Sequence, residues 1–352
     1  MRSPPSGRLS AKKKEQRLQI RVSAKISQRR SRCEIFRLMD SFDALTFGET
    51  MALFIPSAPG PMETSHELVA GMAGTESNFA VGLARLGHSV CWISRVGNDP
   101  FGKRILKTLR GESVNVDHVR VADDAPTGLM FKELRAAGSP NIFYYRRGSA
   151  ASAIDVEQFR GLKSRFLFVT GITPALSESN LKATLAIVDQ FRAAGTNIVF
   201  DPNMRYKLWT AEKARPVFLE LARKSNLLLP SLDEARILTG FEELDQMATA
   251  LLKLGAEKVA IKAGDQGAYF TDGSSSGLIP PFPVQQIDPI GAGDAFCAGV
   301  VSGLLDKLSF RDAVIRGCAM GAICVTAYGD YAALPDRAEL GRFLAGTTAH
   351  NR

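Results

Sequence analysis

The chain has 352 residues, of which 45% are hydrophobic, and its formal net charge at pH 7 is +8. This length suits one large α/β domain with a small appendage, or two modest domains. No segment approaches the roughly 18 consecutive uncharged apolar residues that a membrane helix requires, which argues against a membrane protein. We therefore expect a soluble protein.

The positive charge is concentrated at the amino end. Residues 1–40 hold 12 Lys and Arg against three acidic residues, a net +9, so the remaining chain carries about −1. This distribution argues against a nucleic-acid partner for the body of the protein. The segment is poor in aromatics, and we expect a disordered basic extension. An upstream extension before an initiator at Met39 and an organelle transit peptide stay open as alternatives.

Cysteine and histidine usage bears on the cellular compartment and on zinc binding. The five cysteines are scattered without a Cys-x-x-Cys pair, which is typical of proteins in a reducing cytosol, and we expect a cytoplasmic location. The four histidines are equally dispersed, so a zinc site is not expected.

Apolar strand-like runs alternate with helical patterns along the chain, which predicts βαβ units and a doubly wound, mostly parallel sheet flanked by helices. The predicted strands cover residues 44–47, 90–94, 166–170, 197–200, 227–229, 258–262 and 268–271. The predicted helices cover residues 78–86, 101–109, 179–193, 211–224, 233–238, 244–254, 293–304 and 310–326.

Two segments, about 53–72 and 126–146, interrupt this alternation. Each contains strand-like runs and turn residues without an intervening helix. Antiparallel strands beside an α/β core predict a small β-sheet that acts as a lid. Long surface loops remain the alternative.

The most informative stretch is the sequence Gly291-Ala292-Gly293-Asp294, which precedes a predicted helix. Glycines let backbone N–H groups approach an anion closely, and a helix N-terminus adds unpaired donors and partial positive charge. A carboxylate beside such an anion site could accept the proton of a hydroxyl that attacks a phosphoryl group. The alternative is an ordinary helix cap after a glycine turn.

A second glycine turn, Lys262-Ala263-Gly264-Asp265-Gln266-Gly267-Ala268, follows a predicted strand. Ligands of open α/β sheets bind at the carboxyl ends of strands, so this loop could wrap a nucleotide. An ordinary hairpin turn would look the same. The chain has no GxxxxGK[ST] sequence, and no GxGxxG opens a helix after the first strand, which disfavours a P-loop enzyme and a dinucleotide-binding dehydrogenase.

Two arginines indicate an acidic ligand. On a strand, Tyr144 and Arg146 would point to one side and Tyr145 to the other. Arg205 follows the predicted strand 197–200, again at a carboxyl end. Two guanidinium groups at one pocket would suit a carboxylate. The alternatives are a surface arginine on a lid strand and an ion pair between Arg205 and Asp201.

These motifs together resemble the ribokinase-like, or PfkB, carbohydrate kinases. Gly291–Asp294 is similar to the C-terminal signature of that family. Residues 71–87 are similar to its N-terminal glycine signature, and 97–102 to its next turn. The resemblance extends from about residue 43 to residue 344, so we expect a kinase domain over 41–348.

The resemblance implies ATP and Mg²⁺ as cofactors, and it implies roles for named residues. Asp294 would be the base, with Gly291, Ala292 and Gly293 as the anion loop. Substrate would contact Gly74, Asn78, Tyr144, Tyr145, Arg146, Arg205, Asp294 and Asp330. The nucleotide would contact Ser231, Lys262, Ala263, Gly264, Asp265, Gln266, Gly267, Ala268, Gly291, Ala292, Gly293 and Cys318. Glu234 would organise the metal.

The sequence departs from the family pattern at four places. Ala73 replaces the first glycine of the usual pair, and Pro289-Ile290 replaces a common Thr-Thr. Ser231 stands where the family has an asparagine near the metal, and Cys318 stands where it has one near adenine. The last change puts the adenine hydrogen bond in doubt, but not the fold.

The stretches 144–152 and 201–209, together with Gly329-Asp330, resemble 2-keto-3-deoxygluconate kinases in particular. This resemblance implies ATP-dependent phosphorylation of that sugar acid on its 6-hydroxyl. A kinase for fructose or another sugar remains an alternative, and so does a non-catalytic sugar sensor. The family also implies a homo-oligomer through the lid and a possible monovalent cation near Asp288.

Overall fold

The computed structural model describes residues 41–133 and 140–350, with side chains to residue 346. The basic extension 1–40 lies outside the described residues. One compact unit, made of Phe42–Phe159 and Ser164–Arg352, contains the sheets and helices that build the site, and Arg160–Lys163 is grouped apart from it. Within the described residues, no helix is long and apolar enough to cross a membrane.

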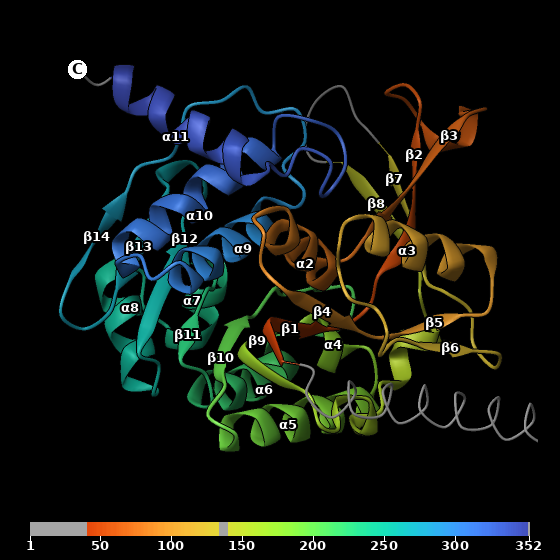
Figure 1. Ribbon diagram of the computed structural model, residues 1–352, viewed down its shortest axis with the longest axis horizontal. Coiled ribbons are helices and arrows are strands. Elements are labelled where there is room, and N and C mark those ends of the chain that lie inside the picture. Colours follow the sequence, from red (N-terminus) through yellow and green to blue (C-terminus); the bar gives the residue numbers. More distant parts are fainter. Residues whose placement is uncertain (1–40, 134–139, 351–352) are drawn as a thin grey trace, which may run out of the picture. The chain divides into compact units, whose positions relative to one another are not determined.

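An eight-stranded sheet forms the centre of this unit, in the order β14-β13-β12-β11-β10-β9-β1-β4 (Figure 1). The strands that pair in parallel are continuous apolar runs buried on both faces, as the sequence predicts. The parallel part consists of β1 (Ser41–Phe47), β4 (Val90–Ile93), β9 (Lys163–Thr170), β10 (Asn197–Asp201), β11 (Leu227–Leu228) and β12 (Lys258–Lys262). The antiparallel edge consists of β13 (Ala268–Thr271) and β14 (Ser276–Ile279).

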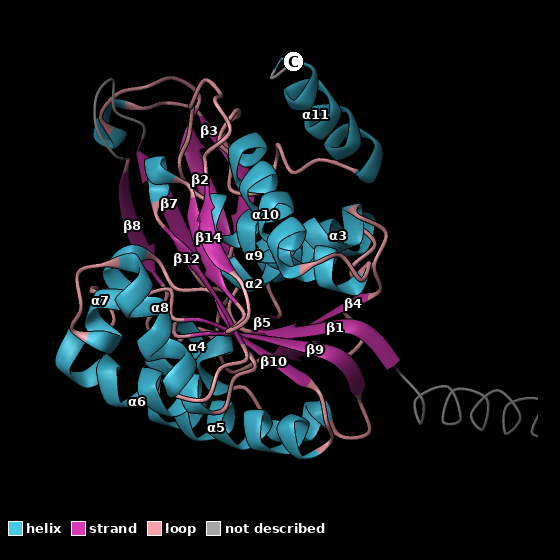
Figure 2. Ribbon diagram, turned by 90° about the vertical axis from the view of Figure 1, so that its left-hand side faces the viewer, coloured by secondary structure: helices cyan, strands magenta, loops and turns pink. Residues whose placement is uncertain are grey.

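Helices cover both faces of this sheet, which confirms the doubly wound α/β prediction (Figure 2). One layer contains α2 (Thr75–Arg85), α9 (Ala292–Leu305) and α10 (Phe310–Cys324), and α11 (Arg337–His350) packs beside α10. The other contains α5 (Glu178–Ala193), α6 (Ala211–Arg223), α7 (Leu232–Thr239) and α8 (Leu244–Lys253). Short α4 (Ile172–Ala175) precedes α5. Phe79 of α2 stacks on Phe168 of β9 with ring centroids 4.0 Å apart, which joins one helical layer to the sheet.

A separate four-stranded sheet fills the two segments predicted as a lid, and we call it the small sheet. Its order is β3-β2-β7-β8, from β2 (Met51–Pro56), β3 (Leu68–Ala73), β7 (Leu129–Glu133) and β8 (Asn141–Tyr145). The surface-loop alternative is therefore wrong. The two hairpins are antiparallel, but β2 and β7 pair in parallel where they join. These strands stand together in Figure 1, beside α3 (Pro100–Gly111).

The sequence prediction missed several elements. Strand β14 has no counterpart among the predicted strands, because it begins with Ser and Gly and only tertiary pairing makes it a strand. A two-stranded sheet of β5 (Arg95–Gly97) and β6 (Arg120–Ala122) was also missed, as was α11. Strands of three residues carry too little periodicity to be recognised in a sequence.

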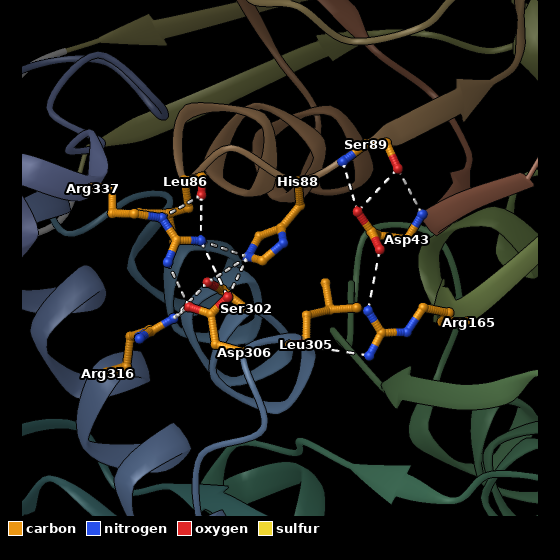
Figure 3. A network of polar contacts seen from close by, with 10 residues as sticks. All are labelled: Asp43, Leu86, His88, Ser89, Arg165, Ser302, Leu305, Asp306, Arg316 and Arg337. Atoms are coloured by element: carbon orange, nitrogen blue, oxygen red, sulfur yellow. Dashed lines mark hydrogen bonds and ion pairs between the residues drawn. The ribbon is translucent and has the colours of Figure 1, made fainter.

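A polar cluster ties the ends of three helices together on the layer of α2, α9 and α11 (Figure 3). Asp306, just after α9, accepts hydrogen bonds from Arg316 at 2.6 Å and from Arg337 at 2.7 Å. Arg337 also donates to the carbonyl of Leu86 at the end of α2. His88 is 2.9 Å from the hydroxyl of Ser302. Charge-assisted bonds of this kind orient the helices that carry the site.

Candidate active site

A cavity of about 260 Å³ opens between the small sheet and the amino end of α9. The carboxyl ends of β1 and β10 approach it, as expected for a ligand site in an open α/β sheet. Its lining includes nine predicted site residues: Gly74, Asn78, Tyr144, Arg146, Arg205, Gly291, Gly293, Asp294 and Asp330. The fold therefore brings together residues that are more than 200 positions apart in the chain.

The helix α9 begins directly at the predicted anion loop. Gly291 is the N-cap in a left-handed conformation with φ of 90°, and a Cβ there would lie 2.1 Å from the carbonyl oxygen of Asp330. Only glycine fits this turn. The backbone N–H groups of the first helical turn are unpaired within the helix and carry partial positive charge, so this end can bind an anion.

Asp294 is not a helix cap, so the alternative of an ordinary cap after a glycine turn is wrong. No side-chain cap bond forms at this terminus. Instead the Asp294 carboxylate accepts from the amide nitrogen of Asn78 at 2.8 Å and lies 3.5 Å from that of Asn203. It is 6% exposed and lines the cavity. The side chain is therefore held at the mouth of the anion loop and faces the space where a ligand would lie.

Burial raises the pKa of Asp294 to about 6, while the Asn78 hydrogen bond and the positive charge of Arg205 act in the opposite direction. A carboxylate with this pKa is ionised at neutral pH but is a stronger base than an exposed aspartate. Neighbouring Glu76 is also buried, and its pKa is raised to about 7. Its oxygen Oε1 accepts from the hydroxyls of Thr170 and Thr173.

The two predicted arginines differ in their surroundings. Arg146 is paired with buried Glu49, to whose Oε2 it donates from Nε at 2.6 Å and from Nη2 at 2.5 Å. Its guanidinium also lies over the ring of Tyr144 at 5.5 Å, so these two side chains share a side of the strand as predicted. The side chain of Arg205 has no ion-pair partner among the described residues.

The ion pair between Arg205 and Asp201, which the sequence left open as an alternative, does not form. Asp201 is fully buried and accepts from Lys262 at 2.8 Å instead. The ammonium of Lys262 also lies beside the anion loop, 3.6 Å from where a Cβ on Gly293 would stand. Lys262 therefore links the predicted nucleotide loop to the anion loop.

Glu234 has both carboxylate oxygens engaged by backbone amides. Met204 N donates to one oxygen at 2.7 Å and Ser231 N donates to the other at 2.7 Å. The Glu234 backbone N–H donates to the hydroxyl oxygen of Ser231, which completes a capping box at the start of α7. Burial raises the pKa of Glu234. The described residues contain no group of three acidic, His or Cys side chains that could hold a metal ion by themselves.

The remaining predicted residues lie outside this cavity. Tyr145 is 67% exposed on the opposite side of β8, where its ring meets Phe131. It lines a neighbouring, larger cavity that shares Tyr144, Arg146 and Arg205 with the first. The loop residues Ala263, Gly264, Asp265, Gln266, Gly267 and Ala268 form a turn that contains a short 3-10 helix after β12, and Cys318 is partly buried on α10. None of these line the cavity at Asp294.

Sequence reasoning missed several residues of the cavity. Glu49, Glu76 and Asn203 line it, and Lys132 lies buried behind it with its ammonium on Asp330. The sequence contains one indication of a role for Lys132, which is that this isolated lysine occupies an inward position of a predicted lid strand. Its partners are 156 and 198 residues away, and only the tertiary structure brings them close.

Comparison with known proteins agrees with this geometry. The profile of the pfkB family carbohydrate kinases matches residues 42–337, which is most of the chain. The chain belongs to the PfkB family of carbohydrate kinases. The match contains the small sheet, the anion loop and the loop after β12.

Individual relatives are similar to this chain over nearly their full length. The 2-dehydro-3-deoxygluconokinase of Bacillus subtilis is 42% identical over 319 residues, which cover 88% of this chain and 98% of that protein. The crystal structure of a PfkB protein from Polaromonas superimposes with a TM-score of 0.78 at 39% identity, over 85% of this chain and 99% of that one. A Vibrio cholerae fructokinase double mutant, solved with fructose, ADP and a potassium ion, gives a TM-score of 0.78 at 26% identity, over 87% and 99%.

Proposed function

We propose that this PfkB kinase transfers the γ-phosphoryl group of ATP to the 6-hydroxyl of 2-keto-3-deoxygluconate. The observation that carries the proposal is the buried carboxylate of Asp294 at the amino end of α9, in one cavity with Arg205, a cation without an ion-pair partner among the described residues. The similarity to the Bacillus subtilis 2-dehydro-3-deoxygluconokinase supports the same substrate.

In this proposal Asp294 accepts the proton of the 6-hydroxyl as its oxygen attacks phosphorus. Asn78 holds the carboxylate in position through its 2.8 Å hydrogen bond. The amides of Ala292, Gly293 and Asp294 stabilise negative charge on the transferring group, because they are already oriented before the reaction. The ammonium of Lys262 adds positive charge next to the same loop.

The nucleotide is proposed to lie against the loop Ala263–Ala268, with Gly264 and Gly267 in left-handed conformations that only glycine adopts readily. Ser231 and Cys318 complete the proposed nucleotide contacts. Mg²⁺ would be bound mainly by the ATP phosphates, as is usual in kinases, and would neutralise charge on them. Glu234 fits a role through water better than direct ligation, since each of its oxygens already accepts an amide N–H.

Selection for a sugar acid is assigned chiefly to Arg205. The charge of Arg146 is neutralised by Glu49 at 2.5 Å, and the resulting pair supports Tyr144. Arg205 has no such partner among the described residues, so its guanidinium is available for a carboxylate. Gly74, Tyr144 and Asp330 would contact the sugar from other sides, with Asp330 accepting from hydroxyl groups. Tyr145 would act from the neighbouring cavity.

The small sheet is proposed to serve as a lid over the sugar and as the contact between subunits of a homo-oligomer. Phe143 and Tyr145 are 44% and 67% exposed on one face of β8. Exposed apolar side chains grouped in this way are typical of an interface. Sedimentation analysis of the wild type and of the double variant Phe143→Glu, Tyr145→Glu would test this, since a homo-oligomer joined here should dissociate.

A coupled assay of ADP release across a panel of sugars tests the proposed activity. Turnover should be highest with 2-keto-3-deoxygluconate and low with fructose. Asp294→Asn should reduce kcat by roughly 10²–10⁴-fold, the usual contribution of a general base. Preferred turnover of fructose would replace the substrate assignment, whereas full activity of Asp294→Asn would reject the mechanism.

A further inference from the structure

A lysine ammonium lies fully buried beneath the anion loop. Lys132, on β7 of the small sheet, is 0% exposed, and its Nζ lies 2.5 Å from Asp288 Oδ2 and 2.9 Å from Asp330 Oδ1. Both carboxylates are nearly inaccessible, at 1% and 4% exposure. A buried lysine is retained only where opposite charges compensate the loss of its hydration.

These three residues determine the shape of the anion loop. Asp288 Oδ1 accepts from the amide of Ile290, which stands directly before Gly291, and Oδ2 accepts from the amide of Gly329. The backbone of Asp330 packs against Gly291 so closely that no Cβ would fit between them. Any movement of Asp288 or Asp330 would therefore move the N–H groups that face the transferring phosphoryl group.

The family resemblance implied a monovalent cation near Asp288, but the residues around this carboxylate do not fit an added ion. One Asp288 oxygen is engaged by an amide, and the other is engaged by an amide and an ammonium. An added cation would have to displace a positive charge that is covalently attached to the chain. Burial opposes the charge of Lys132, but the attraction of the two carboxylates exceeds this effect and raises the Lys132 pKa, so the ammonium stays protonated.

We propose that the ammonium of Lys132 is a built-in monovalent cation, which positions the anion loop and lets the enzyme work without added potassium or ammonium ions. Lys132 is thus a positioning residue that acts through Asp288 and Asp330. Because it lies on β7, it also couples the small sheet to the phosphoryl-transfer site. The catalytic part of this inference rests on the proposed function.

The first experiment measures wild-type kinase activity in choline chloride, NaCl, KCl and NH₄Cl at constant ionic strength, so that screening does not vary. The expected rates are the same in all four salts. Activation by potassium or ammonium of about tenfold or more, equal to ~1.4 kcal/mol of barrier, would overturn the proposal.

The second experiment uses Lys132→Met, which removes the charge but keeps much of the side-chain volume. In choline its activity should fall by about 10²-fold, because a small displacement of positioning groups has such effects. Addition of KCl or NH₄Cl should restore a large part of the rate, which a merely structural role would not predict. Lys132→Arg should keep activity and cation independence, and Lys103→Met, at an exposed position of α3, is the matched control.

Thermal unfolding gives a measurement that needs no sugar substrate. The melting temperature of the wild type should be equal in KCl and choline chloride, and that of Lys132→Met should rise specifically in KCl, because an ion that binds only the folded state stabilises it. This result would support the built-in cation even if the sugar assignment failed. If Lys132→Met were as active as the wild type in choline chloride, the proposal of a built-in cation would be overturned. If that variant does not fold, the wild-type salt series and Lys132→Arg decide the question.

Discussion

Asn78 donates a 2.8 Å hydrogen bond to Oδ2 of Asp294, although the two residues are 216 positions apart in the chain. Asn78 belongs to the first turn of α2 and Asp294 to the first turn of α9, and these two helices pack together. The position of the proposed base and its affinity for a proton therefore depend on the same helix contact.

The activity of the wild type should depend on the ionisation of Asp294. Because burial raises the pKa of Asp294 to about 6, kcat/KM should fall as the pH drops below this value. The Asn78 bond lowers that pKa, so Asn78→Ala should shift the acid limb of the profile to higher pH. Asn98→Ala, at an exposed position, is the matched control. An unchanged acid limb in Asn78→Ala would argue against Asp294 as the titrating group.

Replacement of the base should make the protein more stable at neutral pH. The pKa of Asp294 is higher in the folded state than in the unfolded chain, so its stabilising contribution is complete below about 4 and is lost as the pH rises through about 6. Asp294→Asn avoids a buried charge and should raise the free energy of unfolding at pH 8 by on the order of 1–3 kcal/mol. Urea unfolding at pH 8 and pH 4 measures this, and the gain should disappear at pH 4.

The two arginines of the cavity should give opposite results when each is changed to alanine. Arg146→Ala leaves the buried Glu49 carboxylate without its ion-pair partner, which should cost about 3–5 kcal/mol of stability. Arg205→Ala should leave the melting temperature nearly unchanged and raise KM for the sugar acid by roughly 10–100-fold, as expected for a lost charged hydrogen bond. Unfolding curves and sugar titrations of both variants separate these roles. Equal KM values for the sugar acid in Arg205→Ala and the wild type would remove Arg205 from substrate binding.

The cluster of Figure 3 should make folding sensitive to acid. Burial by itself would raise the pKa of Asp306, but the bonds from Arg337 and Arg316 outweigh it and lower this pKa to about 2. Because the pKa of Asp306 is lower in the folded state, this residue contributes stability at pH values above its unfolded pKa of about 4. The contribution is lost as the pH falls toward 2. Asp306→Asn should therefore reduce the free energy of unfolding at pH 7 by ~2 kcal/mol. Glu178→Gln removes only an exposed ion pair with Lys182 and should change the melting temperature little.

Local sequence was sufficient for the strands of the main sheet other than β14 and for the anion loop. Buried parallel strands are continuous apolar runs, and helices repeat their apolar residues every three to four positions, so both patterns can be recognised without partners. The glycine at 291 indicated an unusual backbone, and its φ of 90° is one that few other residues adopt. Alternation along 144–146 likewise separated Tyr144 and Arg146 from Tyr145, since neighbouring strand residues point to opposite sides.

Only the tertiary structure decided how the charges are paired. Sequence spacing offered Asp201 as a partner for Arg205, but Asp201 lies on Lys262, and Arg146 lies on Glu49. Nothing near Lys132 in the sequence indicated its two carboxylate partners, because they follow it by more than 150 residues. Periodicity records which side of an element is buried, whereas ion pairs across a cavity depend on how distant elements pack, and no short segment contains that information.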